Sequence, residues 1–100
     1  MLIPFNFIDT KLMNSEWNAD LEDETCITLY APDVNKNFYY PGIYKKEFNM
    51  VLIGCNEKLD KAYYIDIEKI KYWSKTYLFT EKDMIENKIP DMDIGNINVI

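Results

Sequence analysis

From Lys61 to Ile89 the chain reads KAYYIDIEKIKYWSKTYLFTEKDMIENKI, and this stretch decides the fold that we expect. It begins with the alternation of apolar and polar residues that is typical of a half-buried β-strand. A dense aromatic patch follows at Tyr72, Trp73, Tyr77 and Phe79. The stretch closes with a short amphipathic helix over residues 80–89, in which Thr80 is the N-cap and Asp83 approximates a capping box. Pro90 ends this predicted helix.

Extended segments upstream are expected to supply the partner strands. Thr25–Ala31 is rich in β-forming residues, and the apolar second half of Ile43–Gly54 predicts a central strand covered on both faces. Between them, Phe38–Tyr40 forms a further extended piece that Pro41 and Gly42 interrupt. Three shorter extended pieces are also predicted. Residues 2–8 form an edge strand or an arm, and residues 97–100 form a final strand. Residues 70–73 continue the strand of residues 62–67 beyond a bulge.

These elements predict a single α+β domain over residues 1–100. Its framework is an antiparallel β-sheet of four to six strands, with the short C-terminal helix packed on one face. An apolar fraction of 48% supplies a core, and a charged fraction of 28% keeps the surface polar. Apolar runs are too short to cross a membrane, and no basic segment precedes the first apolar residues, so we expect a cytoplasmic protein.

The two cysteines, Cys26 and Cys55, each adjoin a predicted strand. Reduced thiols are the rule in the cytoplasm, and we expect both to be buried and inert. The sequence leaves a disulfide between them open. Neither thiol has a histidine that could act as its base.

All eleven basic residues are lysines, and the chain contains no histidine. Arginine is the usual ligand of phosphate, while histidine is the usual base near neutral pH and the commonest metal ligand. We therefore expect no enzyme, no metal and no cofactor, and the net charge of −6 argues against direct binding to nucleic acid. Paired-carboxylate chemistry or a hard-metal site at Asp66 and Glu68, or among Asp20, Glu22 and Glu24, is the alternative.

Charge is segregated along the chain. Residues 1–33 hold seven carboxylates and one lysine, whereas residues 34–75 hold eight lysines and five carboxylates. Residues 9–24, which lack periodicity, are predicted to form a loop with one helical turn near 15–21. The acidic residues proposed to steer a basic partner are Glu16, Asp20, Glu22, Asp23 and Glu24. A solvated loop that only maintains solubility is the other interpretation.

Aromatic side chains could anchor the same partner, because they bury a large area with few torsions. Most of the tyrosines are expected to pack in the sheet. Tyr39, Tyr40 and Tyr77 are the ones expected to be exposed and available for contact. Trp17, in an otherwise polar loop, is either a lid over the sheet or a contact residue.

Within residues 61–89, the pattern Tyr64-Ile65-Asp66, Ile70-Lys71-Tyr72-Trp73, then Thr80, Glu81, Asp83, Ile85 and Asn87 resembles a known signature. It is similar to the C-terminal part of small immunity proteins from bacterial polymorphic-toxin systems, which act in contact-dependent growth inhibition. The resemblance implies an α+β protein that binds a cognate toxin domain, expected to be a basic nuclease, and masks its active site or substrate surface.

Other functions remain open on the sequence. A phage-encoded anti-defence inhibitor that mimics nucleic acid would have the same small size and acidic charge. A structural or assembly subunit would also need no catalytic residues. The gene neighbourhood separates an immunity protein from a phage-encoded inhibitor, because an immunity gene directly follows the gene of its toxin.

Overall fold

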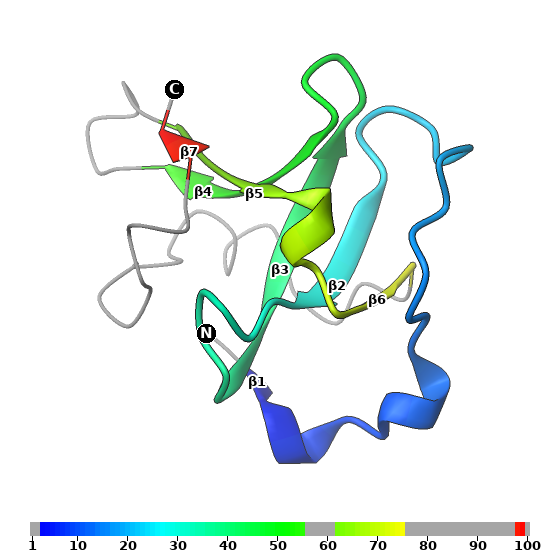
Figure 1. The fold of residues 1–100 in the computed structure, drawn as a ribbon, viewed down its shortest axis with the longest axis vertical. Coiled ribbons are helices and arrows are strands. Elements are labelled where there is room, and N and C mark those ends of the chain that lie inside the picture. The colour runs from blue at the N-terminus through cyan, green and yellow to red at the C-terminus, as the bar shows by residue number, and fades with distance from the viewer. Residues whose placement is uncertain (1–2, 56–61, 76–97, 100) are drawn as a thin grey trace.

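A computed structural model of the chain describes residues 3–55, 62–75 and 98–99, and these residues form mostly antiparallel sheet (Figure 1). The strands are β1 (Ile3–Pro4), β2 (Cys26–Tyr30), β3 (Phe38–Lys45), β4 (Met50–Cys55), β5 (Ala62–Asp66), β6 (Tyr72–Ser74) and β7 (Asn98–Val99). Within the described ranges the helical elements are single 3-10 turns: η1 (Phe5–Phe7), η2 (Thr10–Leu12) and η3 (Ile67–Lys69).

The main path of the sheet has six strands in the order β6-β2-β3-β4-β5-β7, and β1 pairs separately with the start of β3. The predicted antiparallel sheet is thereby confirmed, with the apolar strand β4 in its interior as expected. The predicted helix over residues 80–89 lies outside the described residues.

The predicted strand Ile43–Gly54 is wrong, because a turn divides it into β3 and β4. Phe48 N–H donates to the carbonyl of Lys45, and Asn49 N–H donates to that of Lys46, each at 3.2 Å. Asn49 has a φ of 53°, a left-handed conformation that asparagine tolerates better than most residues. The turn reverses the chain, so β3 and β4 pair as a hairpin.

Strand β3 runs without interruption through Pro41 and Gly42, where the sequence predicted a break. Gly42 permits close packing inside the sheet, since a Cβ atom there would lie 2.5 Å from Val51 Cγ1 and 2.7 Å from Leu29 Cδ2. The glycine therefore serves packing rather than a turn at this position.

The segment that contains Trp73 does not extend β5, contrary to prediction. Turn η3 redirects the chain after β5, and β6 then pairs with β2 near the opposite edge of the sheet. Trp73 lies opposite Leu29 in this pairing, and both side chains are buried. Trp73 thus closes the side of the core that lies farthest along the sheet from β5 and β7.

Both faces of the sheet are covered, because two groups of buried side chains lie on them. The first core cluster consists of Leu21, Ile27, Leu29, Ala31, Val34, Tyr40, Tyr44, Val51, Ile53, Ile65 and Trp73. The second core cluster is built from Tyr30 and Tyr39, and packed against it are the partly buried Ile3, Phe5, Ile8, Met13 and Tyr72.

The predicted exposure of Tyr39 and Tyr40 is wrong, since both have an exposed fraction of 0%. Adjacent residues of a strand point to opposite faces of a sheet, so both can be buried only where both faces are covered. Tyr40 enters the first core cluster, and the N-terminal segment covers Tyr39 on the other face. Neither residue can anchor a partner.

Candidate functional site

The most acidic surface of the described structure is the loop of residues 16–24, hereafter the acidic loop. Its five carboxylates belong to Glu16, Asp20, Glu22, Asp23 and Glu24, and all five residues are exposed. No lysine lies within it. It leads from the segment that pairs with β6 to the start of β2, without the helical turn predicted near residues 15–21.

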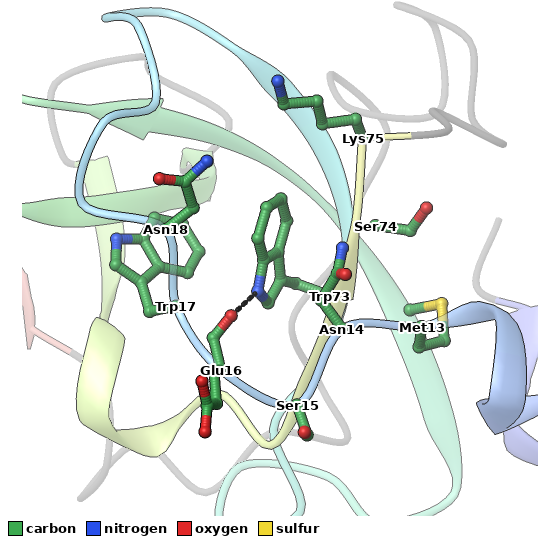
Figure 2. A pocket seen from close by; sticks show the side chains of 9 residues that line it. All are labelled: Met13, Asn14, Ser15, Glu16, Trp17, Asn18, Trp73, Ser74 and Lys75. Carbon is green, nitrogen blue, oxygen red and sulfur yellow. Dashed lines mark hydrogen bonds between the residues drawn. The ribbon is translucent and has the colours of Figure 1, made fainter.

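The first end of the acidic loop is fixed to the edge strand β6 (Figure 2). The indole Nε1 of Trp73 donates a 2.8 Å hydrogen bond to the carbonyl of Glu16. Just before the loop, the backbones of Asn14 and Trp73 exchange two hydrogen bonds of 2.7 and 3.0 Å. The backbone position of Glu16 is therefore set by the sheet.

Trp17 packs against the first core cluster as a lid, and its role as a contact residue stays a prediction. Its ring centroid lies 5.1 Å from that of Trp73 and 5.2 Å from that of Tyr44, and the side chain is half-buried. Its Nε1 is buried and has no hydrogen-bond partner among the described residues. Among the described residues, the Trp17 side chain therefore holds the loop against the core through packing of its ring and not through a hydrogen bond.

The middle of the acidic loop is fixed by Leu21, whose exposed fraction is 2%. Asn18 shapes the turn before it: its side-chain oxygen accepts from Asp20 N–H at 2.9 Å, and its carbonyl accepts from Leu21 N–H at 3.2 Å. This local hydrogen bonding is the Asx turn that asparagine favours. It turns Leu21 into the core while Asp20 and Glu22 remain in solvent.

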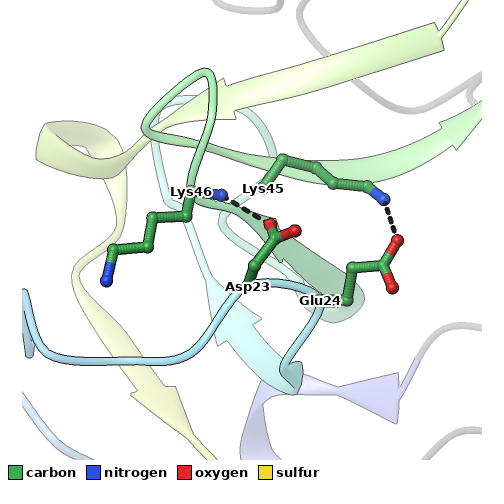
Figure 3. Close-up of polar contacts among 4 residues, drawn as sticks. All are labelled: Asp23, Glu24, Lys45 and Lys46. Atoms are coloured by element: carbon green, nitrogen blue, oxygen red, sulfur yellow. Dashed lines mark hydrogen bonds and ion pairs between the residues drawn. The ribbon is translucent and has the colours of Figure 1, made fainter.

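The far end of the acidic loop is bound to the β3–β4 hairpin (Figure 3). Asp23 Oδ1 accepts from the backbone N–H of Lys46 at 2.9 Å, and Glu24 Oε1 lies 2.9 Å from Lys45 Nζ. The backbone N–H of Glu24 also donates to the carbonyl of Tyr44 at 2.7 Å. Glu24 holds a left-handed φ of 62° in this arrangement.

The carboxylates of the loop therefore divide into two groups. Asp23 and Glu24 have structural partners, and the pKa of Lys45 is raised chiefly because its Nζ donates to Glu24. Within the described part of the chain, the carboxylates of Glu16, Asp20 and Glu22 form no ion pair. These three are the charges that remain available to a partner.

An open hollow of about 810 Å³ lies beside the first end of the loop (Figure 2). It is lined by Met13, Asn14, Ser15, Glu16, Trp17, Asn18, Trp73, Ser74 and Lys75. Most of these side chains are polar. Trp73 and Ser74 of β6, with Lys75 just after that strand, face the lining residues of the N-terminal third. The hollow is a recess in a protein surface whose rim carries one of the available carboxylates.

The remaining predicted contact residue, Tyr77, lies outside the described residues. Sequence reasoning missed Lys45 and Lys46 as anchors of the acidic loop, and it missed Trp73 as a hydrogen-bond donor to that loop. A pair of lysines after an apolar strand gave no indication of which loop they would meet. Only the pairing of strands distant in sequence brings them together.

Other predicted features have been placed as well. Cys26 is free and exposed, so its predicted burial is wrong: it is the first residue of β2, on the face opposite Ile27. Asp66 and Glu68 border a second hollow of about 500 Å³ with Asn49 and Ile67. Among the described residues, no three acidic, cysteine or histidine side chains are grouped so that they could hold a metal ion.

The described helical elements include none with the length and apolar character that crossing a membrane requires. In comparisons with known proteins, no family model, no curated protein and no solved structure matches the chain.

Proposed function

We propose that this chain is an immunity protein that binds a basic toxin domain and covers its active site or substrate surface. The observation that carries the proposal is the anchoring of the acidic loop at both ends and in its middle. Its backbone is held by Trp73, by the burial of Leu21 and by the β3–β4 hairpin. The available carboxylates are thus displayed on ordered backbone.

Ordered backbone matters because binding costs free energy when a flexible loop must be fixed in the complex. A loop that already has its bound conformation avoids much of this cost. The clustered negative charge would also accelerate the encounter with a positively charged partner, an effect that falls as salt screens it. An acidic loop of this kind suits a partner whose own substrate is a polyanion.

Two features of the sequence support the same function. The chain has neither arginine nor histidine, which suits a protein that acts by covering another protein's working surface. The pattern in residues 61–89 resembles that of polymorphic-toxin immunity proteins. The proposal places the protein in the cytoplasm of the toxin-producing bacterium, with no cofactor and no enzymatic activity of its own, and takes the toxin to be a nuclease.

The direct test is co-expression with the toxic domain encoded by the adjacent gene. The wild-type chain should restore growth of the host and co-purify with that domain in a one-to-one complex. A variant with Asp20→Asn and Glu22→Gln should protect less well than a matched variant with Glu47→Gln and Glu68→Gln. Both variants lose the same charge, but only the first loses it from the acidic loop. Failure of the wild-type chain to protect or to co-purify would refute the proposal.

A further inference from the structure

One side of the N-terminal arm, residues 3–13, packs against the sheet and holds the arm in place. Phe5 stacks on Tyr30 and Tyr39, with ring centroids 4.3 and 5.4 Å apart. The arm is also tied to β3 by the β1 pairing, and Phe5 N–H donates to the carbonyl of Asn37 at 2.8 Å. Its inward side chains therefore belong to the second core cluster.

The outward side of the arm carries Phe7 and Leu12, whose exposed fractions are 78% and 76%. They are the most exposed large apolar side chains of the described structure, where Phe48 follows at 42%. The backbone around Leu12 is ordered, since Asp9 Oδ1 accepts from Lys11 N–H and the Asp9 carbonyl accepts from Leu12 N–H, both at 3.0 Å. Two large apolar groups are thus held in water on an anchored segment.

The arm continues directly into the site already described. Met13 packs against the second core cluster and also lines the hollow beside the acidic loop. In Figure 1 the chain from β1 passes along one side of the molecule, by way of η1 and η2, toward the strands β6 and β2. In the strip from Phe7 to Glu24, two exposed apolar side chains, a recess and a run of carboxylates therefore follow one another along the chain.

We propose that Phe7 and Leu12 are the apolar anchors of the interface whose acidic half is the acidic loop. This inference rests on the proposed function. They insert into apolar depressions of the basic partner, while Glu16, Asp20 and Glu22 meet its cationic groups. Large apolar side chains surrounded by polar contacts are the usual source of binding energy in such interfaces.

Charge selects this occupant over a second copy of the chain. The strip carries Asp9 and the available carboxylates of Glu16, Asp20 and Glu22, and the lysines on it are Lys11 and, at the recess, Lys75. A symmetric dimer brings the same surface of each copy together, so it would oppose like charges. Two side chains also cover only a small part of the roughly 800 Å² that a stable interface buries on each partner. Phe7 and Leu12 would therefore be only part of a larger interface, and the partner's side of that interface should carry positive charge.

The test compares a variant carrying Phe7→Ser and Leu12→Ser with a control carrying Phe48→Ser. Binding to the purified toxic domain from the adjacent gene is followed by surface plasmon resonance, and folding is checked by circular dichroism and urea unfolding. We expect the double variant to fold like the wild type and to dissociate on the order of 100-fold faster. The control should dissociate at the wild-type rate.

Each outcome decides between the claims. If the wild-type chain binds and the double variant dissociates at the same rate, the anchors are wrong and the proposed function stands. If the wild-type chain does not bind, the proposed function fails and the anchors fail with it. Sedimentation velocity supplies a separate check, because self-association of the wild type that the double variant loses would make this patch a contact between copies and overturn the inference.

Discussion

The indole nitrogen of Trp73 donates a 2.8 Å hydrogen bond to the carbonyl of Glu16, which joins the edge of the sheet to the first residue of the acidic loop. The two residues are separated by 57 positions in the sequence. Trp73 is itself fixed by its pairing with Leu29 in β2. The position of the loop is therefore a consequence of how the sheet is assembled.

Replacing Trp73 should cost more stability than replacing Trp17. Trp73→Phe removes packing volume and also the hydrogen bond to Glu16, and we expect a loss of about 2 kcal/mol in the free energy of unfolding. Trp17→Phe removes similar volume, but its Nε1 has no hydrogen-bond partner in the described part of the chain, so about 1 kcal/mol should be lost. Urea unfolding of both variants measures the difference. Equal losses would show that the Trp73 hydrogen bond contributes little.

The far anchor of the loop predicts a contrast between two neighbouring carboxylates. Asp23→Ala removes the acceptor for Lys46 N–H and should cost about 1 kcal/mol in the free energy of unfolding. Glu22→Ala changes an exposed side chain and should stay within about 0.5 kcal/mol of the wild type. Amide hydrogen exchange at Lys46 should accelerate only in the Asp23 variant. Unchanged exchange there would contradict the assigned anchor.

Gly42→Ala should destabilise the protein although alanine is otherwise acceptable in a strand. The new Cβ would meet Val51 Cγ1 and Leu29 Cδ2 well inside normal contact distance, and branched Val51 has little freedom to move away. Overpacking of this kind costs about 1–3 kcal/mol. Thermal unfolding measures the effect, which a second substitution, Val51→Ala, should partly relieve. A stable single variant would contradict the close packing of β3 and β4.

Alkaline pH should weaken the second core cluster. Burial raises the pKa of Tyr39, and repulsion from Tyr30, Tyr72 and Asp9 raises it further. Burial also raises the pKa of Tyr30, with a smaller contribution from Tyr72. The folded chain thus holds these protons more tightly than the unfolded chain, in which a phenol titrates at about pH 10. Their contribution to stability is complete below that pH and is lost as the pH rises above it.

Tyr39→Phe tests this dependence, because phenylalanine keeps the ring and removes the titrating group. The midpoint of urea unfolding should fall less between about pH 9 and about pH 11 in the variant than in the wild type. The raised pKa of Lys45 acts in the same pH range but is present in both proteins. An identical decline in the two proteins would exclude a part for Tyr39.

Local pattern was sufficient to predict much of the sheet. The sequence pattern predicted strands close to β2, β5 and β7, and the apolar half of the predicted strand Ile43–Gly54 corresponds to β4. It was insufficient where long-range pairing decides the structure. The alternating pattern that ends near Ile67 did not indicate that β6 would pair with β2. The residue type of Asn49 likewise did not indicate that this position adopts a left-handed conformation in the turn that follows strand β3.

The sequence predicted the acidic residues of the candidate site but not the contacts that hold the acidic loop in place. Carboxylates in a polar loop are expected to be exposed whatever the fold, and Glu16, Asp20 and Glu22 are exposed, while their contact with a partner stays a prediction. Aromatic residues are ambiguous, because the same side chain suits a core and an interface. The exposure of Tyr39 depended on whether a distant segment covers the second face of the sheet, and the N-terminal arm does so.

Association kinetics test the central claim most directly. The rate at which the chain binds the toxic domain from the adjacent gene should be measured by stopped-flow fluorescence at low and at high salt. We expect Asp20→Asn with Glu22→Gln to slow association on the order of tenfold at low salt and little at high salt, while Glu47→Gln with Glu68→Gln leaves it nearly unchanged. Equal effects of the two variants, or a rate that salt does not alter, would contradict the role of the acidic loop.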